Sequence, residues 1–193
     1  SEYVQDVAQT ISQLPSAPIL IGHSNGGAVV QKYLEGNSTP AAVLMCSVPP
    51  MRIIKTTLRT ALGFPLPFLQ SNLTMSLYPL VATPARAHRI FFSPRTPAEL
   101  SAKYHPRLTD ESFLGFLDIL LFSPPNASKV NTPMLVLSGQ DDWLFPPDQV
   151  EATGRAYKTE PIIFQNMGHG MMLEPGWEEV ADSIESWLGK RGL

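Results

Sequence analysis

The chain has 193 residues, of which 44% are hydrophobic, and this length and composition fit one globular domain with a sizeable core. The formal net charge of −3 gives no electrostatic basis for binding nucleic acid or an anionic membrane surface. No run of about 18 consecutive apolar residues occurs, so the sequence predicts no transmembrane helix.

The first quarter of the chain alternates helix-like and strand-like patterns. Apolar residues recur at helical spacing over residues 3–14, which predicts a helix with one buried stripe. Residues 18–22 predict a short, fully buried strand, residues 25–34 a helix that stops at a Gly-Asn pair, and residues 41–47 a second buried strand.

The last third of the chain repeats this alternation. Residues 134–139 and 161–165 predict two more buried strands, with a helix between them over residues 147–157. Residues 177–188 carry an apolar face typical of a C-terminal helix. Buried strands that alternate with helices predict an α/β fold with a mostly parallel sheet.

A long interval separates the second predicted strand from the third. It is too long for a loop inside a compact domain, so we expect residues 49–132 to form a separate structural unit between two parts of the core, residues 1–48 and 133–193. Helix-like pieces cover residues 97–103 and 111–122, and the second is apolar around most of its circumference, so it should be covered on several sides. An apolar helical insertion over a sheet is typical of a lid.

The most informative short motif is Gly22-His23-Ser24-Asn25-Gly26, which has the pattern G-x-S-x-G between a predicted strand and a predicted helix. In that context the serine lies on a sharp, strained turn that lifts its hydroxyl clear of the sheet. The backbone N–H of Asn25, at the start of the helix, then points at any oxyanion that forms at the serine. The alternative is a glycine-rich turn with an incidental serine.

A nucleophilic serine needs a base, and four histidines are available. His169 lies in a glycine-flanked loop after the fourth predicted strand, a position that suits a catalytic imidazole. His23 lies inside the serine turn, where packing or a local hydrogen bond is the simpler explanation. His88 and His105 lie in the predicted lid and read as surface histidines.

The base in turn needs a carboxylate that orients it. Asp141 and Asp142 both follow the third predicted strand and lie at the carboxyl edge of the sheet, where α/β folds bind ligands. Such a pair of acids is otherwise found at helix N-caps or in solvated turns, so the position alone leaves both candidates open.

Together these motifs resemble the α/β-hydrolase superfamily, in particular its capped branch of esterase- and lipase-like serine hydrolases. The resemblance extends over the whole chain, with residues 49–132 as the cap domain. It implies the chain order Ser24, Asp142, His169 for a catalytic triad.

Two further patterns of this superfamily are present. The acid stands in a G-x-x-D-x-x-x-P context, which Gly139, Asp142 and Pro146 fit, so the resemblance favours Asp142 over Asp141. The histidine stands in a G-H-x-x-x-x-E loop, which Gly168, His169 and Glu174 fit.

The sequence also departs from the superfamily pattern. Only 23 residues precede Ser24, and they contain no His-Gly loop, which supplies the second oxyanion N–H in related enzymes. We therefore expect this chain to correspond to the C-terminal two-thirds of such a hydrolase, with one apolar edge of the sheet unpaired and the second oxyanion donor supplied by residues outside this chain.

The function that these patterns predict is cleavage of an apolar carboxylic ester or related acyl compound by Ser24, His169 and Asp142, with Asn25 as an oxyanion donor. No metal or cofactor is expected, and Cys46, the single cysteine, reads as a small core residue. The expected partner is a small acyl substrate. The alternatives are a non-catalytic protein of the same fold that binds a ligand or a partner chain, an inactive fragment, and an acyltransferase or a cofactor-free haloperoxidase-like activity.

Overall fold

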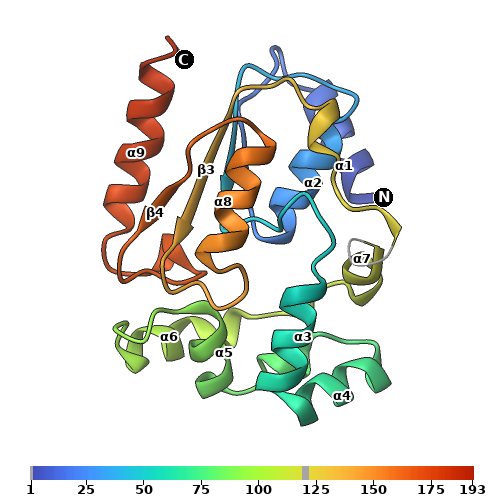
Figure 1. Ribbon diagram of the computed structural model, residues 1–193, viewed down its shortest axis with the longest axis vertical. Helices are drawn as coiled ribbons and strands as arrows, with labels where there is room; N and C mark the ends of the chain where they lie inside the picture. Colours follow the sequence, from blue (N-terminus) through green and yellow to red (C-terminus); the bar gives the residue numbers. More distant parts are fainter. Residues whose placement is uncertain (1, 119–121) are drawn as a thin grey trace.

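The computed structural model describes residues 2–118 and 122–193, which form a parallel four-stranded sheet flanked by helices (Figure 1). The strands are β1 (Leu20–His23), β2 (Ala42–Met45), β3 (Met134–Gly139) and β4 (Ile162–Phe164). They are hydrogen-bonded in the order β1-β2-β3-β4, all parallel. The predicted α/β fold class and the parallel sheet are confirmed.

Helices cover both faces of the sheet. Helices α1 (Glu2–Ser12), α2 (Asn25–Leu34) and α8 (Pro147–Ala156) pack on one face, and α9 (Trp177–Gly189) packs on the other. The alternating side chains of β2 decide this arrangement. Ala42 and Leu44 contact the α2 side, whereas Val43 and Met45 contact the α9 side. All four are buried, as expected of a strand in the middle of a parallel sheet.

Strand β1 corrects one sequence prediction. The run at residues 18–22 predicted a fully buried strand, but Ile21 is 54% exposed. Strand β1 lies at the end of the strand order, and the hydrophobic cluster on the α9 side of the sheet includes residues of β2, β3 and β4 but not Ile21, whereas Leu20 packs on the opposite side. The expected unpaired edge of the sheet is therefore present in the described part of the chain.

The residues between β2 and β3 form a group of short helices beyond the carboxyl ends of the strands (Figure 1). We call residues 49–132 the helical segment. Its α-helices are α3 (Ile54–Gly63), α4 (Pro65–Thr74), α5 (Pro84–Phe91), α6 (Ala98–Tyr104) and α7 (Phe113–Leu117). Single 3₁₀ turns add η1 (Tyr78–Leu80), η2 (His105–Arg107) and η4 (Ala127–Lys129), and η5 (Met171–Leu173) follows β4.

Helix α6 agrees closely with the helix predicted at residues 97–103, and α7 begins inside the helix predicted at residues 111–122. Helix α7 covers only part of it, and residues 119–121 lie outside the described residues. Leu114 is 66% exposed, so the expectation that this apolar stretch is covered on several sides is wrong for that residue. Helices α3, α4 and α5 had no sequence prediction. The division into core and lid stays a prediction.

No helix in the described ranges combines the length and the apolar character needed to cross a membrane.

Candidate active site

Ser24 lies on the turn between β1 and α2, with backbone angles φ 53° and ψ −121°. This left-handed conformation costs an L-residue energy, and the neighbouring hydrogen bonds hold it in place. The Ser24 carbonyl accepts the N–H groups of Gly27 (3.0 Å) and Val48 (3.1 Å), and the Ser24 N–H donates to the carbonyl of Met45 (3.1 Å). The predicted strained turn is therefore present.

Two glycines near Ser24, Gly22 and Gly27, are required by close packing, whereas a Cβ atom on Gly26 would meet nothing within 4 Å. A Cβ atom on Gly22 would lie 2.7 Å from the carbonyl oxygen of Gly26, and one on Gly27 would lie 2.1 Å from the hydroxyl oxygen of Ser47. Side chains at either position would push the start of α2 away from the sheet. The motif thus packs the helix N-terminus tightly against the strand that carries Ser24.

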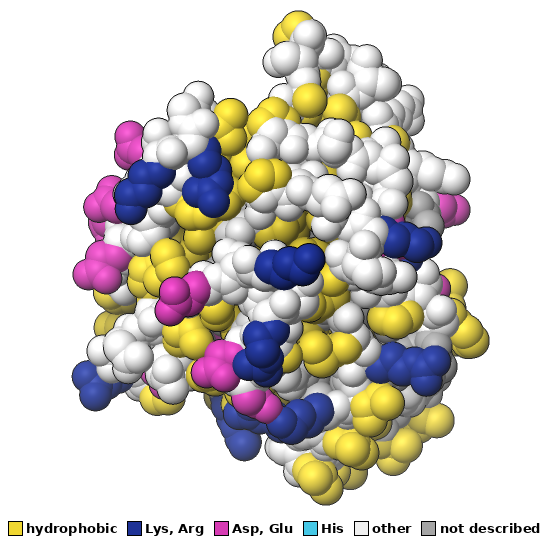
Figure 2. All heavy atoms as spheres, turned by 45° about the horizontal axis from the view of Figure 1, so that its top comes forward, with side chains coloured by type: hydrophobic (Ala, Val, Ile, Leu, Met, Phe, Trp, Pro, Cys, Tyr) yellow, Lys and Arg dark blue, Asp and Glu magenta, His cyan; other side chains and the backbone are white. Residues whose placement is uncertain are grey.

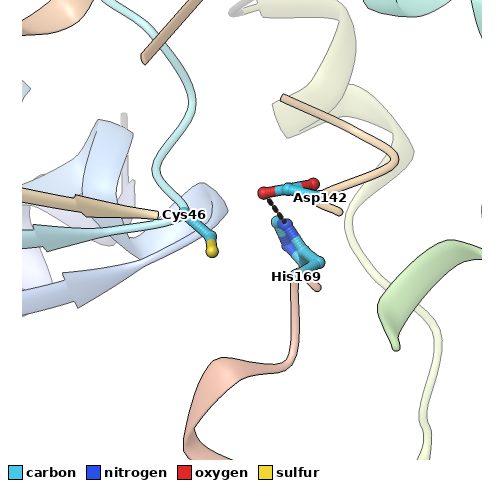
Figure 3. A group of neighbouring side chains, drawn as sticks. All are labelled: Cys46, Asp142 and His169. Carbon is cyan, nitrogen blue, oxygen red and sulfur yellow. Dashed lines mark hydrogen bonds and ion pairs between the residues drawn. The ribbon is translucent and has the colours of Figure 1, made fainter. Parts of the chain in front are cut away.

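His169 and Asp142 form a buried hydrogen-bonded pair (Figure 3). His169 Nδ1 donates to Asp142 Oδ2 over 2.9 Å, and the two residues are 1% and 2% exposed. The other carboxylate oxygen of Asp142 accepts the N–H groups of Leu144 (2.8 Å) and Phe145 (3.0 Å). With every oxygen occupied, the carboxylate is fixed in one orientation and holds the imidazole in the tautomer that leaves Nε2 unprotonated.

The structure separates the two acids that the sequence offered. Asp141 does not contact the imidazole; its Oδ2 accepts the hydroxyl of Ser93, 2.7 Å away in the helical segment. Of the two carboxylates, Asp142 is therefore the one positioned to orient His169.

Ser24 and His169 are not hydrogen-bonded to each other. His169 Nε2 is buried and has no hydrogen-bond partner within the described ranges. The ring of His169 is enclosed by those of His23, Phe91 and Phe145, at centroid distances of 4.8, 5.8 and 5.7 Å. Of the three predicted catalytic residues, Asp142 and His169 are therefore hydrogen-bonded to each other, and Ser24 is not bonded to either. The imidazole of His169 is shielded by the surrounding rings.

His23 contacts both the ring and the backbone of His169. Its Nε2 donates to the backbone carbonyl of His169 over 2.9 Å. Burial, with the neighbouring His169 adding to the effect, lowers the pKa of His23 to about 4. His23 is therefore neutral at physiological pH, in agreement with the predicted local hydrogen-bonding role.

Asn25 is the first residue of α2, so its backbone N–H has no partner within the helix. Its side-chain amide donates to Glu111 of the helical segment over 3.3 Å. The predicted lid histidines are engaged elsewhere, since His88 bonds to the hydroxyl of Ser101 and His105 bonds to the carbonyl of Val81.

A cavity of about 390 Å³ lies between Ser24 and the helical segment. Its walls are mostly apolar, and its charged lining residues are Arg107 and Glu111. A second cavity of about 150 Å³ adjoins His23 and His169. Phe91 lines both cavities.

Three metal-ligating residue types come together at Cys46, Asp142 and His169, whose ligand atoms lie within 4.8 Å of one another (Figure 3). Burial raises the pKa of the Cys46 thiol well above its usual value, with the Asp142 charge adding to the effect. A protonated thiol and a ring nitrogen that already donates to a carboxylate are poor metal ligands, because ligands must be deprotonated. Cys46 lies in the core, as predicted.

Sequence reasoning missed the tie that holds the His169 loop. Glu174 is 1% exposed and accepts the N–H of Gly168 (2.7 Å), the N–H of Ser93 (2.8 Å) and the hydroxyl of Thr96. This one carboxylate therefore joins the loop beside His169 to the helical segment. The sequence does contain a signal for this contact, because Glu174 is the acid at the end of the G-H-x-x-x-x-E pattern.

Comparison with known proteins places these features in context. A family model described as serine aminopeptidase, S33, matches residues 1–176. No curated protein matches the sequence significantly.

Solved structures with the same fold include several hydrolases. A thermophilic esterase from Thermogutta terrifontis has a TM-score of 0.71 and 19% identity, over 97% of this chain and 71% of its own. The Paleococcus ferrophilus monoacylglycerol lipase has a TM-score of 0.69 and 23% identity, over 98% and 75% of the two chains. A bromoperoxidase from Bacillus anthracis has a TM-score of 0.66 and 17% identity, over 96% and 72%. At these identities the similarity shows the fold.

Proposed function

Because the chain belongs to the α/β-hydrolase superfamily, in the family of the serine aminopeptidase S33 model, we propose that it is a serine hydrolase that cleaves a carboxylic ester or a related acyl compound. Ser24 is the nucleophile, His169 the general base and then the general acid, and Asp142 the residue that orients His169. The observation that carries this proposal is the buried 2.9 Å bond between Asp142 and His169, at the same sheet edge as the strained Ser24 turn.

In the proposed reaction, Ser24 Oγ attacks the substrate carbonyl and its proton passes to His169 Nε2. The tetrahedral oxyanion accepts a hydrogen bond from the N–H of Asn25. The intermediate collapses to an acyl-enzyme, and His169 returns the proton to the leaving alcohol. Water, activated by His169 in the same way, then releases the acid and restores Ser24.

This reaction requires His169 Nε2 to approach Ser24 Oγ to about 3 Å, which is the distance of a productive hydrogen bond. In the structure the imidazole is covered by the Phe91 and Phe145 rings. We propose that substrate entry displaces Phe91, which lines both cavities. Hydrogen bonds at catalytic residues commonly tighten only when substrate is bound.

The cavity supports an apolar acyl or alkyl group as the substrate portion held near Ser24. Its walls are largely hydrophobic, and its volume of about 390 Å³ lies within the range of small-molecule sites. We propose that the helical segment forms the cap of this enzyme, because α3, α4 and α7 contribute to the wall opposite Ser24.

The test is steady-state hydrolysis of p-nitrophenyl esters of increasing chain length by the wild type and matched variants. Ser24→Ala and His169→Ala should each lower kcat by about 10⁴-fold or more. Asp142→Asn should lower kcat by about 10³- to 10⁴-fold, whereas its neighbour Asp141→Asn, the matched control, should keep most of the activity. Equal losses at Asp141 and Asp142 would contradict the assigned roles.

One observation favours a second candidate, a non-catalytic member of the family that binds an apolar ligand in the cavity. His169 Nε2 is fully covered and unbonded in the described part of the chain, as in a site that does not turn over. That candidate predicts saturable binding of a long-chain fatty acid by the wild type, without ester hydrolysis.

An alcohol acceptor added to the ester hydrolysis assay separates acyl transfer from hydrolysis, because transfer yields a new ester.

A further inference from the structure

The outward faces of α3 and α4 are apolar. Side chains at helical spacing along α3 and α4 form what we call the leucine face. These two helices lie at the lower end of the molecule in Figure 1, and Figure 2 shows hydrophobic side chains gathered at its lower end. Its members are between 52% and 83% exposed: Ile54 52%, Leu58 59%, Leu62 83%, Leu66 77%, Leu69 55% and Leu73 76%. Single exposed leucines are ordinary on protein surfaces, but six on two adjoining helices form a contiguous patch.

The most buried side chains of the same two helices are polar, although the half-buried Phe68 of α4 also lines the cavity. Thr56, Thr60 and Ser71 are 6%, 7% and 1% exposed, and all three line the cavity beside Ser24. A helix on the surface of a water-soluble protein has the opposite polarity, with its apolar stripe inward. The pair α3–α4 is therefore built to face an apolar medium on its outer side.

The part of the sequence that contains the leucine face is basic. The sequence has no Asp or Glu between Glu35 and Glu99, while that interval contains the basic residues Arg52, Lys55, Arg59, Arg86, Arg89 and Arg95. The overall net charge of −3 conceals this local excess, so the sequence-based exclusion of anionic membrane surfaces does not apply to this region.

Two carboxylates from other parts of the chain reach this region. Asp148 pairs with Lys55, and Asp110 accepts the N–H groups of Leu77 and Tyr78 beyond the end of α4. Arg52 and Arg59 are exposed and make no ion pair with any described residue. They therefore leave a net positive flank beside the leucine face.

We propose that the leucine face docks on an anionic phospholipid surface, with its aliphatic side chains inserted into the interface and Arg52 and Arg59 at the headgroups. An apolar helix face bordered by basic residues is the pattern of helices that lie in the plane of a membrane. The face contains only aliphatic side chains, whereas the centres of protein–protein interfaces favour aromatic anchors, so a lipid surface fits better than a protein partner.

Docking in this way places the cavity directly behind the lipid contact, since the inner sides of α3 and α4 form its wall. Acyl esters that dissolve in the lipid would then reach Ser24 without crossing bulk water. This substrate class rests on the proposed function, whereas the docking itself does not.

The experiment is sedimentation of the protein with phospholipid vesicles, either of phosphatidylcholine alone or of equal parts phosphatidylcholine and phosphatidylglycerol. The test variant is Leu62→Asn/Leu66→Asn/Leu73→Asn, and the control is Leu14→Asn/Leu193→Asn, whose leucines are 45% and 48% exposed elsewhere on the molecule. We expect the test variant to lower the partition coefficient on the mixed vesicles by at least about 100-fold and the control to leave it unchanged.

The charge contribution is tested separately. Arg52→Gln/Arg59→Gln should weaken partitioning onto the mixed vesicles by about 10-fold and have little effect on phosphatidylcholine alone. Because all these side chains are exposed, circular dichroism should show unchanged folding. Failure of the wild type to bind mixed vesicles, or binding that survives the leucine substitutions, would overturn the proposal. So would a wild-type dimer that the leucine substitutions dissociate and that binds no vesicles.

The readout separates docking from catalysis. Ser24→Ala should bind vesicles like the wild type, and the leucine variant should hydrolyse a short soluble ester at the wild-type rate. Vesicle binding without any ester hydrolysis supports docking and contradicts the proposed function. Hydrolysis of soluble esters without vesicle binding supports the proposed function and contradicts docking.

Discussion

At the residue scale, Ser24 combines its position at the cavity with a backbone conformation that an L-residue rarely adopts. The φ of 53° is held by the hydrogen bonds of its own peptide groups to Met45, Gly27 and Val48. Strain that surrounding contacts maintain is typical of functional positions, because there geometry is selected ahead of stability.

This strain makes a testable prediction. Ser24→Gly should raise the free energy of unfolding by about 1 kcal/mol relative to Ser24→Ala, because glycine adopts positive φ without steric cost. Urea denaturation of the two variants measures the difference, and both should lack activity. If the alanine variant is as stable as the glycine variant, the turn is not strained in solution.

His23 makes a prediction about pH. Its pKa in the folded protein is lowered to about 4 from 6.5, mainly by burial, so between these values the unfolded chain binds a proton that the folded chain does not. The resulting stability is fully present above pH 6.5 and is lost as the pH falls toward 4, by up to about 3 kcal/mol. The titratable groups facing His23 are His169 and Asp142.

Denaturant unfolding across this pH interval measures the effect. In His23→Gln the amide can still donate to the His169 carbonyl but cannot titrate, so the slope of stability against pH should decrease. A slope that is unchanged in His23→Gln would show that other groups cause the acid sensitivity.

At the scale of elements, the helical segment is fastened to the two loops that carry Asp142 and His169. The carbonyl of Phe91 accepts the N–H of Gly170 (2.6 Å), and the Ser93 hydroxyl donates to Asp141 (2.7 Å). Glu174 adds its bonds to Gly168, Ser93 and Thr96. Movement of the segment is therefore coupled to the position of the imidazole.

Glu174→Ala tests this fastening. It leaves buried N–H groups at Gly168 and Ser93 without an acceptor, so it should lower the free energy of unfolding by about 3 kcal/mol. Glu160→Ala, at an exposed glutamate, is the control and should change it by less than about 0.5 kcal/mol. Equal stabilities of the two variants in urea would show that the tie contributes nothing in solution.

At the scale of the whole molecule, local patterns were enough to predict the sheet. Strand β3 and helix α2 have the predicted bounds, because a buried apolar run and a glycine-bounded periodic segment are local signals. The Ser24 turn was predictable for the same reason. The exposure of Ile21 was not, since it depends on the place of β1 in the strand order.

Contacts between distant parts of the chain explain the remaining differences. The enclosure of His169 by Phe91 and the distinct partners of Asp141 and Asp142 join residues more than 25 positions apart. The outward leucines of α3 and α4 contradict the usual polarity rule, so periodicity alone does not show which side of each helix is buried.

The central claim is that Ser24 is an activated nucleophile, and labelling with a fluorophosphonate probe tests it most directly. The probe reacts with a serine that a base has activated, so the wild type should be labelled on the peptide that contains Ser24, and Asp141→Asn should be labelled like the wild type. Ser24→Ala should not react, and His169→Ala should react at least about 100-fold more slowly. No label on the folded wild type, or label that persists in Ser24→Ala, would contradict the account.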